Sequence, residues 1–244
     1  MVHSKAYIPI CLTAFLAMTA CQTTRFESES AEAHFDRGIE YLGAGDYSPA
    51  IAEFSAAVRL QPRFIDALKS RSIAYRKSGN LRASIKDETR IIEIDNNNFW
   101  AYGARGNAYL VSGEPARAIL DYNAAIRIKP DYKFAYVNRG NAYDDLGDSA
   151  RALRDFAEAI RIDPDAAEPH FDRAVTYHRQ HRYREAIIDY SEAIRLNPTD
   201  AAAYYRRGIE YDESGERARA IADWEKAVSL DSSFGKYVSE RLKK

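Results

Sequence analysis

The chain has 244 residues, of which 46% are apolar and 29% are charged, and this composition excludes a fully disordered protein. Lys and Arg total 35 against 36 for Asp and Glu, so a net charge of −1 provides no general attraction to nucleic acid or to an anionic membrane surface. The two cysteines, Cys11 and Cys21, lie near the amino terminus, which excludes a disulfide framework or a cysteine-based zinc site elsewhere.

Residues 1–20 have the pattern of a secretory signal peptide. A short basic start ends at Lys5 and precedes an apolar run of about 15 residues, whereas a membrane-spanning helix needs roughly 18–20. The sequence Leu-Ala-Met-Thr-Ala-Cys at 16–21 resembles the lipobox of bacterial lipoproteins. This resemblance implies that Cys21 carries acyl chains such as palmitate. Gln22, rather than Asp, after the cysteine implies an outer-membrane lipoprotein that faces the periplasm.

The alternatives at this end are cleavage by the ordinary signal peptidase, or an apolar amino terminus that arose by chance in a soluble protein. Residues 21–30 are polar and lack apolar periodicity, which predicts a lipidated cysteine followed by a flexible tether. Nine extended residues span at most about 30 Å. The folded part is therefore expected to work near the membrane.

From residue 31 onward the sequence repeats at an interval of 34 residues. The repeat is seen first in six tyrosines: Tyr41, Tyr75, Tyr109, Tyr143, Tyr177 and Tyr211. Columns of small residues run through Gly38 and Ala50, and an aromatic column runs through Phe54, Tyr122, Phe156, Tyr190 and Trp224. Each unit contains two stretches with helical periodicity around a turn, and prolines end several units.

A 34-residue helix-turn-helix with these spacings resembles the tetratricopeptide repeat, or TPR. The resemblance implies an all-α, right-handed superhelical solenoid, in which the aromatic column fills the space between neighbouring helix pairs. Six repeats are expected at 31–64, 65–98, 99–132, 133–166, 167–200 and 201–234, and residues 235–244 are expected to form a capping helix. Ser72, Ser84 and Glu88 depart from the columns, which predicts looser packing in the second repeat.

One column of arginines replaces the apolar residue that is usual in this family. Its members are Arg37, Arg71, Arg105, Arg139, Arg173 and Arg207, and Arg241 continues it into the cap. An acidic residue follows 16 positions after each of the six: Glu53, Asp87, Asp121, Asp155, Asp189 and Asp223. We expect one structural Arg–carboxylate pair in each repeat. The alternative is an arginine stripe that binds anionic ligands.

In TPR proteins the first helix of each repeat lines a concave groove, and the resemblance implies the same here. The expected groove residues are Trp100, Asn107, Leu110, Phe134, Asn138, Asn141, Phe171, His178 and Tyr205. Aromatic rings provide apolar area and amides pair with a peptide backbone, so the set favours an extended peptide or a partner protein. For any single ring, the alternative is packing between helices. Gly103 and Asp172 replace the cations of a carboxylate clamp, which argues against that mode of binding.

Charged residues near the ends of the first helices alternate in sign from repeat to repeat, at 144–145, 178–179 and 212–213. This pattern favours salt bridges between repeats. The alternative is a charged rim that sets the register of a bound partner.

The sequence contains no motif that predicts catalysis. It lacks a phosphate-binding loop, a zinc-protease motif and a nucleophile elbow, and the Ser-x-x-Lys match at 233–236 has no companion motif. His178 and His181 do not form a metal site on one helical face, because His181 occupies a turn. We expect no enzyme activity, cofactor, metal or nucleic acid; the sequence does not indicate an oligomeric state.

The function predicted from the sequence is a membrane-anchored TPR scaffold that binds peptides or partner proteins, as an adaptor for envelope enzymes or as an assembly factor. The first alternative is a pilotin-like chaperone for secretin or pilus assembly. The second is a soluble TPR scaffold without lipidation.

Overall fold

A computed structural model describes residues 29–243, which form thirteen α-helices, one short 3-10 helix and no strand. The all-helical architecture confirms the predicted fold class. The predicted signal peptide, Cys21 and the tether up to residue 28 lie outside the described residues. The elements are α1 (Ala31–Ala44), α2 (Tyr47–Leu60), α3 (Ile65–Lys77), α4 (Leu81–Ile94), α5 (Phe99–Val111), α6 (Pro115–Ile128), α7 (Lys133–Asp145), α8 (Ser149–Ile162), α9 (Ala167–Arg179), α10 (Tyr183–Leu196), α11 (Ala201–Glu213), α12 (Arg217–Leu230), η1 (Ser232–Phe234) and α13 (Gly235–Leu242).

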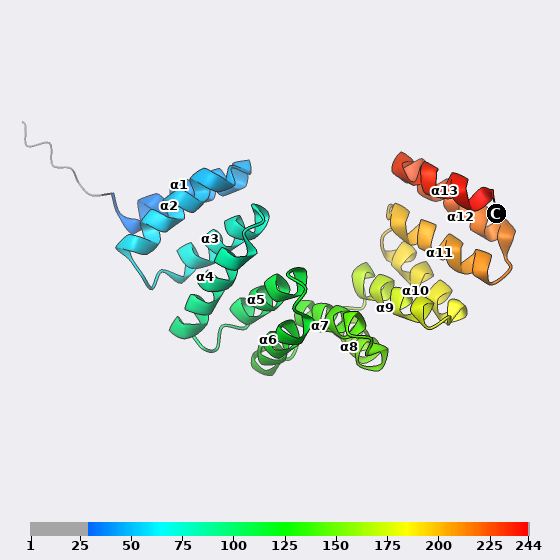
Figure 1. The fold of residues 1–244 in the computed structure, drawn as a ribbon, viewed down its shortest axis with the longest axis horizontal. Helices are drawn as coiled ribbons and strands as arrows, with labels where there is room; N and C mark the ends of the chain where they lie inside the picture. The colour runs from blue at the N-terminus through cyan, green and yellow to red at the C-terminus, as the bar shows by residue number, and fades with distance from the viewer. Residues whose placement is uncertain (1–28, 244) are drawn as a thin grey trace, which may run out of the picture.

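The helix pairs follow one another along a curved ribbon, with α1 near one end and α13 at the other (Figure 1). The odd-numbered helices lie on the inner side of the curve. Consistent with this, α5 contacts α7 and α7 contacts α9 directly, in addition to the contacts inside each pair. We call the surface formed by the odd-numbered helices the inner surface. None of the helices in residues 29–243 has the length and apolar character needed to span a bilayer.

In four of the six pairs, close packing depends on a glycine that faces an aromatic ring. A Cβ atom on Gly140 would lie 2.7 Å from Cε1 of Phe156, and one on Gly208 would lie 2.5 Å from Nε1 of Trp224. Such distances leave no room for a side chain. Each of these rings lies on the glycine of its own pair, because only glycine leaves space there. Rings of the same column also pack against the next pair, as predicted: Phe54 clusters with Ala74 and Tyr122 with Ala135.

The second pair fills the same space with a buried polar cluster. Glu88 occupies the aromatic column and is fully buried. Its Oε1 accepts hydrogen bonds from Ser72 Oγ at 2.6 Å, from Ser84 Oγ at 3.1 Å and from Arg76 Nη1 at 3.3 Å. Burial raises the pKa of Glu88 from 4.5 to about 7. The expected looser packing is thus replaced by a hydrogen-bonded cluster with no exposed surface at Glu88.

The turn inside each pair requires a left-handed backbone. Five pairs place a glycine there, with φ between 76° and 83°: Gly45, Gly79, Gly113, Gly147 and Gly215. His181 stands at this point in the fifth pair with φ of 58°. A non-glycine residue in this region is strained, because its Cβ approaches the neighbouring carbonyl oxygen.

Replacing His181 by Gly is therefore expected to stabilise the fold by about 0.5–1 kcal/mol. The gain is limited, since the variant loses the contact between His181 Nδ1 and the Tyr183 hydroxyl at 2.8 Å and makes the unfolded chain more flexible. Urea unfolding followed by circular dichroism measures the change. The reverse substitution Gly113→His should lower the midpoint, and a lower midpoint for His181→Gly would contradict the strain argument.

The last helix covers the apolar end of the stack. Val238 is 6% exposed and packs in a cluster with Ile209 and Trp224. Tyr237 precedes it by one residue, about 100° around the helix, and is 54% exposed. Arg241 makes a different contact from the other arginines of its column. Its Nη1 lies 3.7 Å from Glu213 Oε1.

Candidate functional site

The arginine column holds the two helices of each pair together. Arg105 Nε and Nη2 donate to the two carboxylate oxygens of Asp121 at 2.8 and 2.7 Å. The same two-bond arrangement occurs in Arg71–Asp87, Arg139–Asp155, Arg173–Asp189 and Arg207–Asp223. The aspartate side chains are at most 10% exposed. These guanidinium groups are engaged inside the fold, which argues against the anion-binding stripe.

The arginines also connect neighbouring repeats. The remaining Nη1 of Arg105 donates to Thr89 Oγ1 of the preceding repeat at 3.1 Å. Equivalent bonds join Arg71 to Ser55, Arg139 to Asn123 and Arg207 to Ser191. Sixteen residues before Arg173 the chain has Ala157, whose side chain cannot accept a hydrogen bond. Sequence analysis missed this link, although the polar column 16 residues before the arginines was the signal for it.

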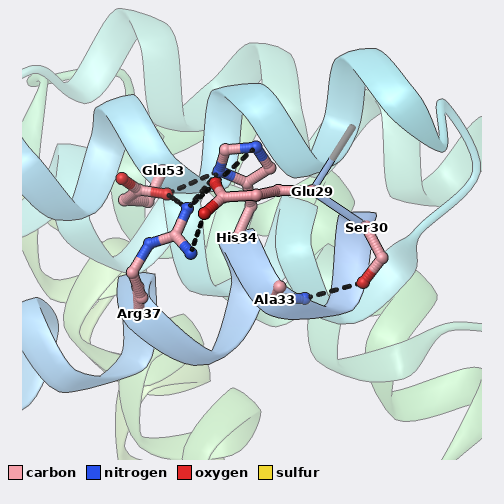
Figure 2. Close-up of polar contacts among 6 residues, drawn as sticks. All are labelled: Glu29, Ser30, Ala33, His34, Arg37 and Glu53. Carbon is pink, nitrogen blue, oxygen red and sulfur yellow. Dashed lines mark hydrogen bonds and ion pairs between the residues drawn. The ribbon is translucent and has the colours of Figure 1, made fainter. Parts of the chain in front are cut away.

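In the first repeat, Glu29 provides the acceptor that the preceding repeat provides for most of the other arginines (Figure 2). Arg37 Nη1 and Nη2 donate to Glu29 at 3.1 and 2.5 Å, and Nη2 also donates to Glu53 Oε2 at 3.0 Å. A hydrogen bond with His34 and the Arg37 guanidinium hold the pKa of Glu53 below its ordinary value. Ser30 Oγ caps α1 by accepting from Ala33 N at 3.1 Å. The last two residues of the predicted flexible tether are thus fixed to α1.

A pocket of about 240 Å³ lies on the inner surface between the third and fourth pairs. We call it the Trp100 pocket. Its lining residues are Arg76, Trp100, Ala104, Asn107, Tyr132 and Phe134. The structure brings together Trp100, Asn107 and Phe134, which were expected in the groove. Phe134 is 37% exposed, and Lys69 Nζ lies 4.7 Å from the centroid of the Trp100 ring. Exposed rings beside cations can hold an apolar side chain of a partner.

Sequence analysis missed Arg76 and Tyr132 as pocket residues. Tyr132 lies in the loop before α7, and its ring reaches over α5, where a Cβ on Gly103 would lie 2.8 Å from Tyr132 Cε1. The rings of Tyr132 and Phe134 are 5.6 Å apart. The signal was the glycine at 103, because the other repeats carry larger side chains in that column.

Two of the expected groove aromatics lie in a second pocket, of about 260 Å³, near the carboxyl-terminal end. Its lining residues are Phe171, Ala202, Tyr205, Arg206, Phe234 and Tyr237. Tyr205 and Phe234 have ring centroids 5.1 Å apart, whereas Phe171 packs edge-on against the buried Tyr190 at 5.4 Å. The four aromatic residues expected in the groove are therefore divided between two pockets, Trp100 and Phe134 in one and Phe171 and Tyr205 in the other.

These features identify the family. The tetratricopeptide repeat family model matches residues 35–99 and 137–201, and a second tetratricopeptide repeat model matches 101–132 and 201–234. The chain belongs to the tetratricopeptide repeat family. No curated protein sequence matches the chain significantly.

Solved TPR structures share this fold over most of the chain. PilF of Pseudomonas aeruginosa has a TM-score of 0.73 and 15% identity, over 88% of this chain and 97% of PilF. YrrB has a TM-score of 0.58 and 18% identity, over 77% of this chain and 97% of YrrB. A chain of the APC/C hetero-tetramer Cut9-Hcn1 has a TM-score of 0.71 and 17% identity over 83% of this chain, which spans 40% of that one. At these identities the similarity shows the TPR fold.

The amides predicted for the TPR groove make different contacts. Asn138 Nδ2 donates to Phe134 O at 2.8 Å, inside its own helix. Asn141 Nδ2 donates across the repeats to Asp172 Oδ2 at 3.1 Å. Burial raises the pKa of Asp172 from 3.8 to about 6. Asn141 therefore marks the border between the fourth and fifth repeats on the inner surface.

Two further groove candidates make contacts inside the fold, His178 with the next repeat and Leu110 with the core. Nδ1 of His178 lies 2.8 Å from Oε1 of Glu210, which is 1% exposed and whose pKa burial raises. Leu110 packs against the core cluster that contains Tyr109 and Tyr122, and it lines neither pocket. An aliphatic side chain gains more from apolar neighbours than from a polar surface. Leu110 is thus a packing residue in this structure.

The charges at the ends of the inner helices form pairs between repeats. Arg179 donates to Asp144 of the preceding repeat, and the Asp144 side chain is only 8% exposed. Asp145, next to it, is exposed. Among residues 29–243, no group of three or more histidine, cysteine, aspartate or glutamate side chains is placed to hold a metal ion.

Proposed function

We propose that this TPR protein is a non-enzymatic scaffold that binds an extended segment of a partner protein on its inner surface. TPR proteins generally act as protein-interaction scaffolds, and YrrB is described as a TPR protein with an unusual peptide-binding site. The observation that carries the proposal is the Trp100 pocket. Three aromatic side chains meet there on a surface that the stacking of the repeats leaves open.

The non-enzymatic assignment is supported by how the charged groups are used. The repeated arginines and aspartates pair with one another inside the fold, and the buried Glu88 is held by two serines and an arginine. The TPR fold is typically that of a scaffold. Turnover of an envelope polymer by the purified protein, lost in an Asp144→Asn variant, would overturn this assignment.

The double substitution Trp100→Ala/Phe134→Ala is expected to weaken partner binding at least tenfold, because it removes most of the apolar wall of the pocket. A partner is first captured from the cell envelope and purified, and its affinity is then measured by titration calorimetry. The control is Leu120→Ala/Ile188→Ala, which removes two exposed apolar side chains on even-numbered helices. Unchanged affinity in the first variant and loss in the second would place the site on the outer surface.

We further propose that acyl chains on Cys21 attach the protein to the outer membrane. The support is the lipobox-like sequence at 16–21 and the polar segment that joins it to the fixed Glu29. More than one acyl chain is needed for stable attachment. Attachment at Cys21 would place the amino-terminal end of α1 within about 30 Å of the membrane.

A Cys21→Ala variant is expected to lose labelling by radioactive palmitate and to leave the membrane fraction. Mass spectrometry of the mature amino terminus and fractionation of the envelope provide the measurement. Normal retention of Cys21→Ala in the membrane would contradict lipidation at this residue. Wild-type protein in the soluble fraction, without added mass, would support the soluble scaffold instead.

A pilotin-like chaperone for secretin or pilus assembly is the second candidate. The observation in its favour is that the fold similarity to PilF spans 88% of this chain and 97% of PilF. Deletion of the protein would then reduce the amount of secretin multimer in the outer membrane, whereas an adaptor for envelope enzymes would leave this amount unchanged.

A further inference from the structure

We propose that the inner surface selects a segment in which a bulky apolar side chain enters the Trp100 pocket and a Lys or Arg side chain about three residues away pairs with Asp172. An acidic residue on the other side of the apolar one would face Lys69 and Arg76. This inference rests on the proposed function and adds the chemistry of the partner.

The Trp100 pocket is apolar in its walls and positive along one side. Trp100, Tyr132 and Phe134 provide the rings, and Ala104 leaves space between them. The cations come from the second repeat: Arg76 lines the pocket, and Lys69 lies over the Trp100 ring. Positive charge on that side disfavours a basic ligand residue in the pocket and favours an acidic residue next to it.

One repeat further along, the inner surface becomes acidic. Asp172 is largely buried, and among residues 29–243 its carboxylate has the Asn141 amide as a hydrogen-bond donor and no cation within ion-pair distance. Its neighbour Asp144 already pairs with Arg179. Glu168 and Asp144 add negative charge around Asp172, and burial raises its pKa. A ligand ammonium or guanidinium group would supply the missing counter-charge.

The distance between the two subsites fits a short extended peptide. The pocket lies between α5 and α7, and the Asn141–Asp172 contact lies between α7 and α9. Neighbouring packed helices are roughly 10 Å apart, and an extended chain advances about 3.3 Å per residue. The basic side chain should therefore stand about three residues from the apolar one. Either chain direction satisfies this pattern, because side chains make the contacts.

The probe is acetyl-Ser-Glu-Ser-Phe-Ser-Ser-Arg-Ser-amide, whose capped ends exclude binding through a terminal carboxylate. Binding to the full protein is measured by NMR titration at low salt, with the reversed sequence as a second probe. Two probe variants replace Phe by Ala or Arg by Glu. We expect each variant to bind at least tenfold more weakly than the probe from which it derives.

On the protein side, Asp172→Asn keeps the size of the side chain and removes its charge, and should weaken the Arg probe about tenfold. Glu225→Gln, an exposed acid on α12, is the control and should have no effect. The variant Asp172→Lys should bind the probe in which Glu replaces Arg better than it binds the original Arg probe. Structural damage alone could not produce this exchange of preference.

The outcomes separate the inference from the proposed function. If Trp100→Ala weakens the probe but Asp172→Asn and Asp172→Lys do not alter charge preference, the inference is overturned and the scaffold function stands. If Phe→Ala in the probe and Trp100→Ala in the protein both leave binding unchanged, both the inference and the inner-surface site are overturned.

Discussion

Raising the pH from 5 to 8 is expected to destabilise the second TPR by on the order of 3 kcal/mol, and Glu88→Gln is expected to remove most of this loss. Glu88 fills the position of an aromatic ring between α3 and α4. Ser72 and Ser84 satisfy one carboxyl oxygen, whereas Oε2 is buried without a hydrogen-bond partner. The site therefore accommodates a neutral carboxylic acid better than a carboxylate.

The sign of the effect follows from the two pKa values of Glu88. Burial raises the pKa of Glu88 in the folded protein to about 7, whereas its ordinary value is 4.5. The folded state holds the proton more tightly, so this contribution to stability is fully present below about pH 4.5 and is lost as the pH rises through about 7. Arg76 and Arg105 oppose the shift through their positive charges. The difference of 7 − 4.5 = 2.5 units corresponds to about 3 kcal/mol.

Hydrogen exchange of the amides in α3 and α4 at pH 5 and pH 8, corrected for intrinsic rates, measures the local stability of this repeat. Glu93→Gln is the matched control, because Glu93 lies on the same helix with its side chain 58% exposed. In the wild type and the control, protection should fall between pH 5 and pH 8; in Glu88→Gln it should change little. An equal fall in all three proteins would show that Glu88 is not the group that titrates.

The fold could be predicted because its determinants lie in strict columns of the sequence. Gly140 and Phe156 are 16 residues apart, and the equivalent Gly208 and Trp224 have the same separation. In four of the six pairs, a glycine facing a ring on the partner helix sets the approach of the two helices, so one unit indicates the geometry of the others. Where a repeat departs from the columns, as at Glu88, the sequence indicated a difference but not the hydrogen-bonded cluster that results.

Contacts between repeats were harder to predict than contacts inside them. The bond from Arg105 to Thr89 depends on the offset between successive pairs, which no single unit contains. Tyr132 enters the inner surface from a loop, whereas the sequence argument considered only the first helices. Phe171 and Tyr205 share a column with Gly103, and they line a separate pocket because the cap supplies new aromatic neighbours there.

The second large effect is expected for an arginine pair. Asp155→Ala should lower the free energy of unfolding by about 3 kcal/mol or more, because it leaves the Arg139 guanidinium without its carboxylate. Asp155 accepts two hydrogen bonds from Arg139, each 2.7 Å long, and its side chain is 8% exposed. Asn123 of the preceding repeat would still accept from Nη1, but a neutral oxygen does not balance the charge. The loss should therefore extend to the junction with the third repeat.

The same helix offers a control with equal loss of formal charge. Glu158 pairs with Arg161 three residues away, and these side chains are 35% and 68% exposed, so Glu158→Ala should cost less than about 0.5 kcal/mol. Arg139→Met/Asp155→Leu removes both charges of the buried pair and should recover much of the stability that Asp155→Ala loses. Guanidinium unfolding of the three variants tests whether the arginines of the column stabilise the fold as buried pairs or are surface charges. If Asp155→Ala and Glu158→Ala had similar midpoints, the arginines would be surface charges, and a role in binding anionic ligands would again have to be considered.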